Sequence, residues 1–137
     1  MRNIVFALFT CALLIFVSCS KENSNVDITG KWNIIYDSSY TGVGLGNHIV
    51  EYRGHFGDYF NFSSDNKLYI KEGNSIKTLD YLMVTDSTAI IASFGITVNG
   101  IPPNTFIKDF SAHHVTLLTP FFATPGGTFG RSVQLSR

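Results

Sequence analysis

The chain has 137 residues, enough for one domain, and its ten Lys and Arg residues balance ten Asp and Glu residues. Because it has no basic excess, it lacks the charge of a dedicated nucleic-acid binder. Charged residues make up only 15% of the chain and the mean hydropathy is +0.15, which excludes a long disordered protein, while twelve Phe and six Tyr favour strands over helices.

The first residues predict a secretory signal peptide. Arg2 precedes an apolar run over residues 4–17, and the small residues Ser18 and Cys19 follow. At about 1.5 Å per residue, a helix of this run reaches about 21 Å, short of the ~30 Å hydrocarbon core of a membrane. No polar face interrupts the run, which disfavours a helix packed on the domain. A cleaved signal is therefore the favoured interpretation.

The segment Phe16-Val17-Ser18-Cys19 resembles the lipobox of bacterial lipoproteins, in which the Cys becomes the first mature residue and carries acyl chains such as palmitate. Several acyl chains anchor a protein firmly, so the resemblance implies the membrane as a partner. It also implies three segments: a signal peptide over 1–18, a lipidated Cys19 with a polar tether over 19–27, and a folded domain over 28–137.

Removal of the signal has two consequences for the mature chain. Cys11 leaves with it and Cys19 carries lipid, so no disulfide forms and the domain depends on its core alone. Ser20 after Cys19 resembles sorting to the outer membrane of a Gram-negative cell envelope. Whether the domain faces the periplasm or the outside is left open by the sequence.

From Asp27 onward the apolar residues alternate with period two, which indicates strands. Trp32, Ile34 and Tyr36 share one predicted face, and Lys31 and Asp37 belong to the other. Polar or Gly- and Pro-containing turns separate nine such stretches, which predict a barrel of about eight strands. Their ranges are 31–37, 48–53, 58–62, 67–71, 75–84, 88–97, 105–110, 113–119 and 129–135. An all-β, antiparallel up-and-down barrel is preferred over a sandwich, because closure removes exposed edges.

Two motifs carry a resemblance to a known family. Ile28-Thr29-Gly30-Lys31-Trp32 resembles the Gly-x-Trp opening of lipocalins and fatty-acid-binding proteins, and Tyr81 with Val84-Thr85-Asp86 is similar to a strand-turn motif of small lipocalin-like lipoprotein domains. The family resemblance implies that Gly30, Trp32 and a basic residue of the last strand plug the closed end. Antiparallel pairing of the last and first strands favours Arg137 over Arg131 as the residue that covers Trp32.

We expect this barrel to bind a small hydrophobic ligand non-covalently in its interior. An eight-stranded barrel is just wide enough either to be filled by side chains or to hold one small molecule. The alternative is a filled barrel that acts as a structural or adaptor lipoprotein with a protein partner. The predicted interior, and hence the predicted ligand-binding set, is Tyr36, Phe60, Phe62, Leu68, Ile70, Tyr81, Met83, Phe94, Phe106 and Phe110.

Two apolar loops are further candidates. The stretch Gly42-Val43-Gly44-Leu45-Gly46 lies within a predicted loop over 38–47 and is interpreted as a mobile lid or, alternatively, as an ordinary loop. Phe121 and Phe122 are expected in a loop after Pro120, folded back onto the barrel mouth or exposed to a membrane or partner.

Catalytic and metal-binding patterns have little support. His113 and His114 are adjacent on a predicted strand and so point to opposite faces, which prevents joint chelation. Asp58, Asp80 and Asp109 are predicted to face outward, and no nucleophile motif is present. We therefore expect no enzyme activity, no metal and no cofactor.

Overall fold

The computed structural model describes residues 27–43, 46–95, 97, 99–124 and 127–137. The predicted signal segment, Cys19 and most of the tether therefore lie outside the described residues. In the described part the chain forms strands and no helix, and so no helix in it is long and apolar enough to cross a membrane. The strands are β1 (Gly30–Val43), β2 (Gly46–Arg53), β3 (Tyr59–Phe62), β4 (Lys67–Glu72), β5 (Ser75–Thr85), β6 (Thr88–Ile91), β7 (Asn104–Lys108), β8 (His114–Thr124) and β9 (Gly127–Ser136).

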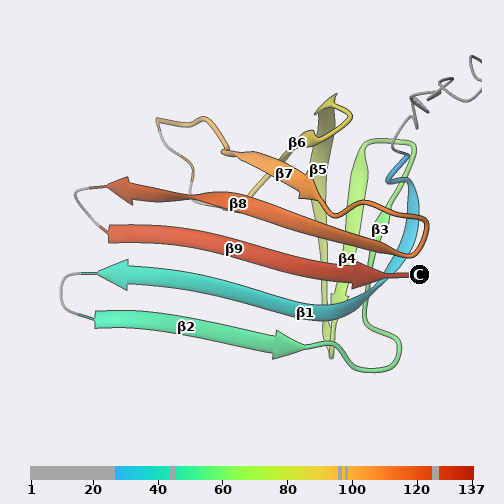
Figure 1. The fold of residues 1–137 in the computed structure, drawn as a ribbon, viewed down its shortest axis with the longest axis horizontal. Coiled ribbons are helices and arrows are strands. Elements are labelled where there is room, and N and C mark those ends of the chain that lie inside the picture. The colour runs from blue at the N-terminus through green and yellow to red at the C-terminus, as the bar shows by residue number, and fades with distance from the viewer. Residues whose placement is uncertain (1–26, 44–45, 96, 98, 125–126) are drawn as a thin grey trace, which may run out of the picture.

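These strands form a closed eight-stranded antiparallel up-and-down barrel, as predicted (Figure 1). Neighbours in sequence pair from β3 to β9, and β9 returns to pair with β1 from Asn33↔Ser136 to Gly42↔Thr128. The β2 and β3 segments follow each other along the same edge of β1, so together they occupy one position in the barrel.

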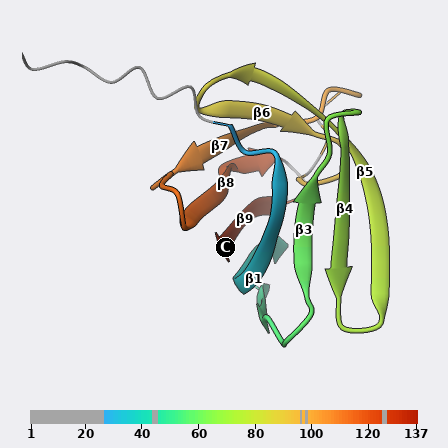
Figure 2. The same cartoon turned by 90° about the vertical axis from the view of Figure 1, so that its right-hand side faces the viewer.

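The break between β2 and β3 depends on Gly54. Its backbone N–H donates to the carbonyl of Ile35 at 3.2 Å, which presses this turn against β1. A Cβ atom at this position would lie 1.8 Å from the carbonyl oxygen of Ile34, so only glycine fits. The chain then leaves the β1 edge briefly, and β3 turns with β4 and β5 into the second side of the barrel (Figure 2).

The two ends of the barrel differ. The end where Asp27 enters and the C-terminus lies is closed over Trp32, which is fully buried. At the other end the β1–β2 and β8–β9 hairpins extend beyond the short strands β3, β6 and β7 as a longer sheet (Figure 1). The core fills the space nearer the closed end with Ile28, Trp32, Ile34, Phe60, Phe62, Leu68, Ile70, Tyr81, Ala89, Ile91, Phe94, Ile107, Val115, Leu117, Val133 and Leu135.

Two strand predictions are corrected by the structure. The strand predicted over 88–97 is shorter, because β6 ends at Ile91 and residues 92–95 do not continue it. Residues 120–124 are not a loop, because β8 continues to Thr124 through a bulge between Thr119 and Phe122. A bulge tolerates proline because the ladder is already interrupted there, so Pro120 fits without ending the strand.

Candidate functional site

A cavity of about 390 Å³ opens at the mouth of the barrel, between the long hairpins and the β4–β5 hairpin. It is partly open to solvent and has walls of mixed character. Apolar contributions come from Val50, Phe94 and Phe129. The remaining lining residues are Asp37, Ser39, Tyr52, Glu72, Lys77, Ser93, Gly95 and Arg131.

A bulge in β1 turns Asp37 into this cavity. Ile34 pairs with Leu135, but the next β9 residue, Gln134, pairs with Tyr36, which leaves Ile35 as an extra residue. One extra residue reverses the inward and outward positions of everything that follows. Asp37 therefore lies opposite the buried Val133 and faces inward, whereas Tyr36 faces outward.

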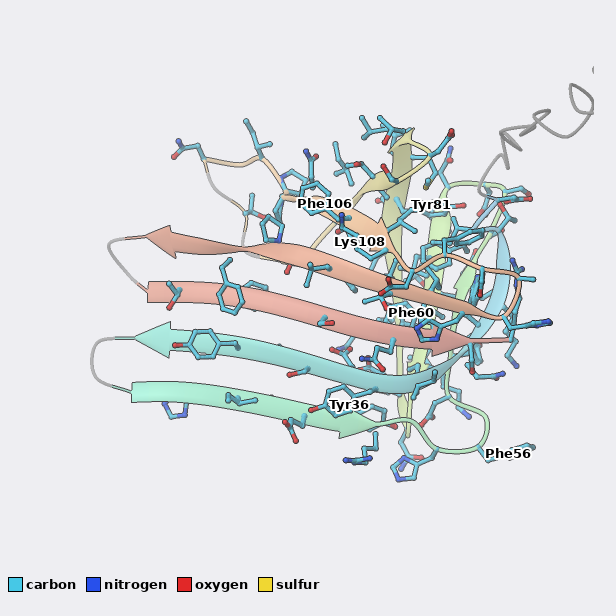
Figure 3. All side chains as sticks on the ribbon, viewed as in Figure 1. Tyr36, Phe56, Phe60, Tyr81, Phe106 and Lys108 are labelled. Atoms are coloured by element: carbon cyan, nitrogen blue, oxygen red, sulfur yellow. The ribbon has the colours of Figure 1, made fainter. Side chains whose placement is uncertain are left out.

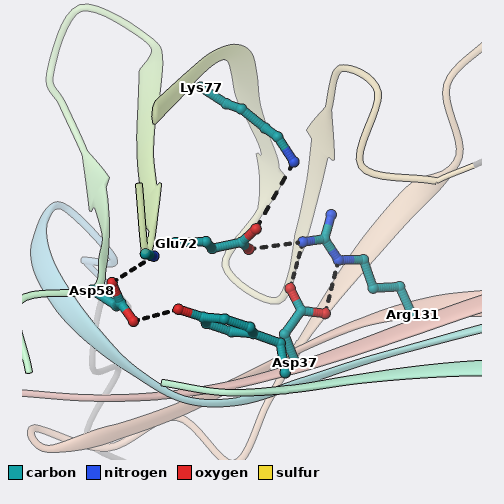
Figure 4. Close-up of polar contacts among 7 residues, drawn as sticks. Asp37, Asp58, Glu72, Lys77 and Arg131 are labelled. Atoms are coloured by element: carbon teal, nitrogen blue, oxygen red, sulfur yellow. Dashed lines mark hydrogen bonds and ion pairs between the residues drawn. The ribbon is translucent and has the colours of Figure 1, made fainter. Parts of the chain in front are cut away.

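Arg131 is the centre of the polar network at the base of the cavity (Figure 4). Its Nε donates to Oδ1 of Asp37 at 3.1 Å, and its Nη2 donates to Oδ2 at 2.5 Å. The guanidinium also lies 4.3 Å from the ring centroid of Phe94, in cation–π contact. A bidentate pair held against an aromatic ring has a fixed geometry, so the charge is preorganised.

Glu72, at the end of β4, joins this network from the opposite wall. Its Oε1 is 3.5 Å from Nη2 of Arg131, and its Oε2 is 3.8 Å from Nζ of Lys77. Burial raises the pKa of Glu72, and the nearby Asp37 carboxylate raises it further, against the opposing charges of Arg131 and Lys77. The cavity thus holds a carboxyl group that takes up a proton more readily than an ordinary glutamate.

A second polar cluster lies next to the cavity and fixes its wall. Asp58 accepts hydrogen bonds from the Tyr52 hydroxyl at 2.5 Å, from the backbone N–H of His55 at 2.7 Å and from that of Gly73 at 2.8 Å. The Tyr52 bond, with the two backbone bonds, lowers the pKa of Asp58 to about 2, and the same bond raises the pKa of Tyr52 to about 12. Asp58 therefore ties the β2–β3 break to the β4–β5 turn.

This finding corrects the prediction that Asp58 faces outward, since only 2% of Asp58 is exposed. Asp58 immediately precedes β3 and continues its alternation, so it points inward on the same side as Phe60 and Phe62. Asp80 and Asp109 are exposed, as predicted.

The predicted interior set is largely buried but does not line the cavity. Phe60, Phe62, Leu68, Ile70, Tyr81 and Phe94 are buried in the core, with Met83 and Phe110 packed against it, and only Phe94 also reaches the cavity. The Tyr81 hydroxyl is already used by the carbonyl of Ser63 at 2.9 Å. These side chains occupy the space that the sequence interpretation had assigned to a ligand.

Two predicted interior residues lie outside the barrel (Figure 3). Tyr36 faces outward because of the β1 bulge, with the Arg53 guanidinium 5.8 Å from its ring centroid. Phe106 lies between the buried Thr105 and Ile107, so it points away from the core, and the Lys108 ammonium group lies over its ring at 5.7 Å. Both assignments to the interior were wrong.

The predicted lid is mostly strand. Gly42 and Val43 are the last residues of β1 and Gly46 is the first of β2, whereas Gly44 and Leu45 lie outside the described residues. The predicted loop over 38–47 is thus the end of a long hairpin.

The predicted loop that contains Phe121 and Phe122 is also strand. Phe121 lies on the outer face, 68% exposed, with its ring 5.5 Å from that of Tyr40 and over Gly130, where a Cβ atom would lie only 3.1 Å from it. It does not fold onto the mouth. The side chain of Phe122 is outside the described part.

The predicted contact between Arg137 and Trp32 is present at the closed end. The Arg137 guanidinium lies 3.9 Å from the Trp32 ring centroid, and the Trp32 indole N–H donates to the carbonyl of Ile28 at 2.8 Å. Arg137 also donates to the carbonyls of Ala112 and Thr29, at 3.2 Å each. Gly30 is placed beneath Arg137, whose Nη1 would lie 3.5 Å from an added Cβ.

The sequence interpretation missed the charged residues of the cavity. Asp37 was placed on the outer face because strict alternation was assumed, and Arg131 was considered only as a partner for Trp32. In the described part no three His, Cys, Asp or Glu side chains gather as metal ligands would. His114 is the first residue of β8, and His113 precedes the strand.

Searches of protein-family models, curated proteins and solved structures find no match to this chain. The site is therefore interpreted from its own geometry.

Proposed function

We propose that this protein is a lipid-anchored, lipocalin-like protein of the cell envelope that binds one small amphipathic molecule without covalent chemistry. The single observation that carries the proposal is the mouth cavity of about 390 Å³, whose lining combines apolar and charged side chains. Small-molecule sites are concave and combine apolar side chains with polar groups that orient the ligand, and this cavity contains both. Val50, Phe94 and Phe129 would contact the apolar part of the ligand, and the Arg131 network its polar part.

A cavity-filling substitution tests this proposal with a matched control. Ser39 lines the cavity, whereas its neighbour Ser38 pairs with Ser132 on the outer face of the sheet. Ser39→Phe is expected to abolish binding of amphiphiles that the native chain binds, and Ser38→Phe to leave it unchanged. Thermal-shift screening and calorimetry measure both. The proposal fails if no amphiphile binds the native chain, or if both variants bind alike.

The anchor is proposed on the lipobox resemblance at Cys19 and has its own test. Labelled palmitate should enter the native protein and not the Cys19→Ala variant, and only the native protein should fractionate with the outer membrane. Equal labelling of both would remove the anchor from the proposal while leaving the cavity function standing.

The alternative, an adaptor with a protein partner, is favoured by the outer face. Phe56 is fully exposed (Figure 3), and the exposed Phe121 packs against Tyr40 rather than the core. Native mass spectrometry of gently extracted protein separates the two functions: a bound small molecule supports the cavity, and a stoichiometric protein supports the adaptor.

A further inference from the structure

The buried charges at the base of the cavity do not balance. Asp37 is 7% exposed, and the side chains of Glu72 and Arg131 are 18% and 17% exposed. These three groups bring two carboxylates against one guanidinium. Lys77 provides the remaining positive charge, but its side chain is 58% exposed.

The two carboxylates are neutralised to different degrees. Asp37 forms a bidentate pair with Arg131 at 3.1 and 2.5 Å. Glu72 shares only the outer edge of that guanidinium, at 3.5 Å, and its other oxygen has Lys77 at 3.8 Å. A separation of 3.8 Å is too long for a hydrogen bond. Glu72 is therefore the more weakly paired of the two carboxylates.

Lys77 is held loosely in this position. Exposed ion pairs at such distances contribute little stability, and a lysine side chain on β5 can turn into solvent at little cost. Figure 4 shows the Lys77 ammonium above the Glu72 carboxylate and the Arg131 guanidinium beside it. Glu72 and Lys77 both line the cavity, so the departure of Lys77 would leave one Glu72 oxygen facing it.

We propose that Glu72 binds the primary ammonium group of the ligand and that Lys77 occupies this position until the ligand displaces it. The inference rests on the proposed function and names its ligand class, a small amphiphile with an amine head and a short apolar tail. The tail lies against Val50, Phe94 and Phe129. An anionic head would instead bring a third negative charge next to two carboxylates.

The affinity of this site for the amine then depends on pH. The titratable and charged groups that face Glu72 are Asp37 from β1, Tyr52 from β2, Lys77 from β5 and Arg131 from β9. The raised pKa of Glu72 means that its charge is lost at a higher pH than for an ordinary glutamate. Amine affinity falls as the pH falls through that pKa, so acidification releases the ligand at a higher pH than an ordinary glutamate would.

Calorimetry on the full chain in nanodiscs, with empty nanodiscs as the blank, tests this with three probes that share one tail. These probes are phenylbutylamine, phenylbutanol and phenylbutanoate. The amine should bind about tenfold or more tightly than the other two, because the alcohol has no charge to pair with Glu72 and the carboxylate is repelled by it. Glu72→Gln should remove that preference.

Lys77→Met provides the sharper variant, because removal of a basic residue should strengthen binding. The amine affinity should rise about threefold or more, since no internal ammonium competes. Lys67→Met is the matched control: Lys67 lies on β4 and pairs with the exposed Asp80, outside the cavity lining, so binding should not change. Thermal melting checks that each variant is folded.

The outcomes separate the two claims. Binding of all three probes with equal affinity, blocked by Ser39→Phe, would overturn the amine site and leave the proposed function standing. A preference for phenylbutanoate, or unchanged or weaker amine binding in Lys77→Met, would also overturn it. Absence of binding by every probe would count against both.

Discussion

The two ends of the barrel use the same contact, a guanidinium over an aromatic ring, for different purposes. At the closed end Arg137 lies 3.9 Å from the Trp32 ring and donates to backbone carbonyls. At the mouth Arg131 lies 4.3 Å from the Phe94 ring and donates to carboxylates. Backbone carbonyls are fixed and neutral, so Arg137 only seals the end.

Carboxylates, by contrast, can exchange partners and protons. The difference shows that the filled core and the candidate binding cavity are spatially separated in this chain. Apolar side chains fill the barrel from Trp32 towards the mouth, and the charged cavity lies beyond them at the mouth. Substitutions at the two ends should therefore have different consequences.

The largest expected effect is on the closed end. Trp32→Ala removes the fully buried ring and should cost about 3–5 kcal/mol in the free energy of unfolding. Phe129→Ala, in the half-buried cavity wall, should cost about 1 kcal/mol and weaken ligand binding instead. Urea unfolding measures both. Equal losses of stability would show that the ends are not distinct.

Asp58→Asn should lower the free energy of unfolding by about 2–3 kcal/mol, because three hydrogen bonds to a buried carboxylate are weakened together. The pKa of Asp58 is lowered from 3.8 to about 2, so its contribution is complete above pH 3.8 and is lost as the pH falls towards 2. Urea unfolding across this range should show a smaller pH dependence in the variant. Asp80→Asn, at an exposed site, should behave like the native protein in both respects.

Arg131→Met leaves Asp37 and Glu72 without their shared partner and should lower the free energy of unfolding by about 1–3 kcal/mol. This loss is smaller than for a fully buried pair because 17% of the Arg131 side chain is exposed. The double variant Arg131→Met with Asp37→Leu should recover part of this loss, because the unpaired charge is removed with its partner. A double variant that is no more stable than the single one contradicts this account of the network.

Arg137→Met is expected to lower the free energy of unfolding least, by about 0.5–1 kcal/mol. Arg137 is exposed, and its contacts are a cation–π contact and hydrogen bonds to backbone carbonyls. Ligand binding at the mouth should not change. A loss of binding in this variant would mean that the two ends are coupled.

Strand alternation in the sequence was sufficient to predict the barrel and the core residues Phe60 and Phe62. The contact between Trp32 and Arg137 was predicted from the family resemblance and from antiparallel pairing of the first and last strands. Strand alternation failed wherever a bulge changes the period, as at Ile35, or a strand continues through proline, as at Pro120. The charged cavity could not be predicted from the sequence for the same reason. Asp37 reaches it only because of the bulge, and Arg131 and Glu72 meet across strands far apart in sequence.

The most direct test of the central claim is amide and indole NMR of the isotope-labelled chain during titration with phenylbutylamine. The account predicts shifts at the mouth, at Ser39, Gly95 and the Arg131 side chain, and no shift of the Trp32 indole N–H. Shifts centred on Trp32, or spread evenly through the core, would contradict a filled barrel whose binding site is confined to its mouth.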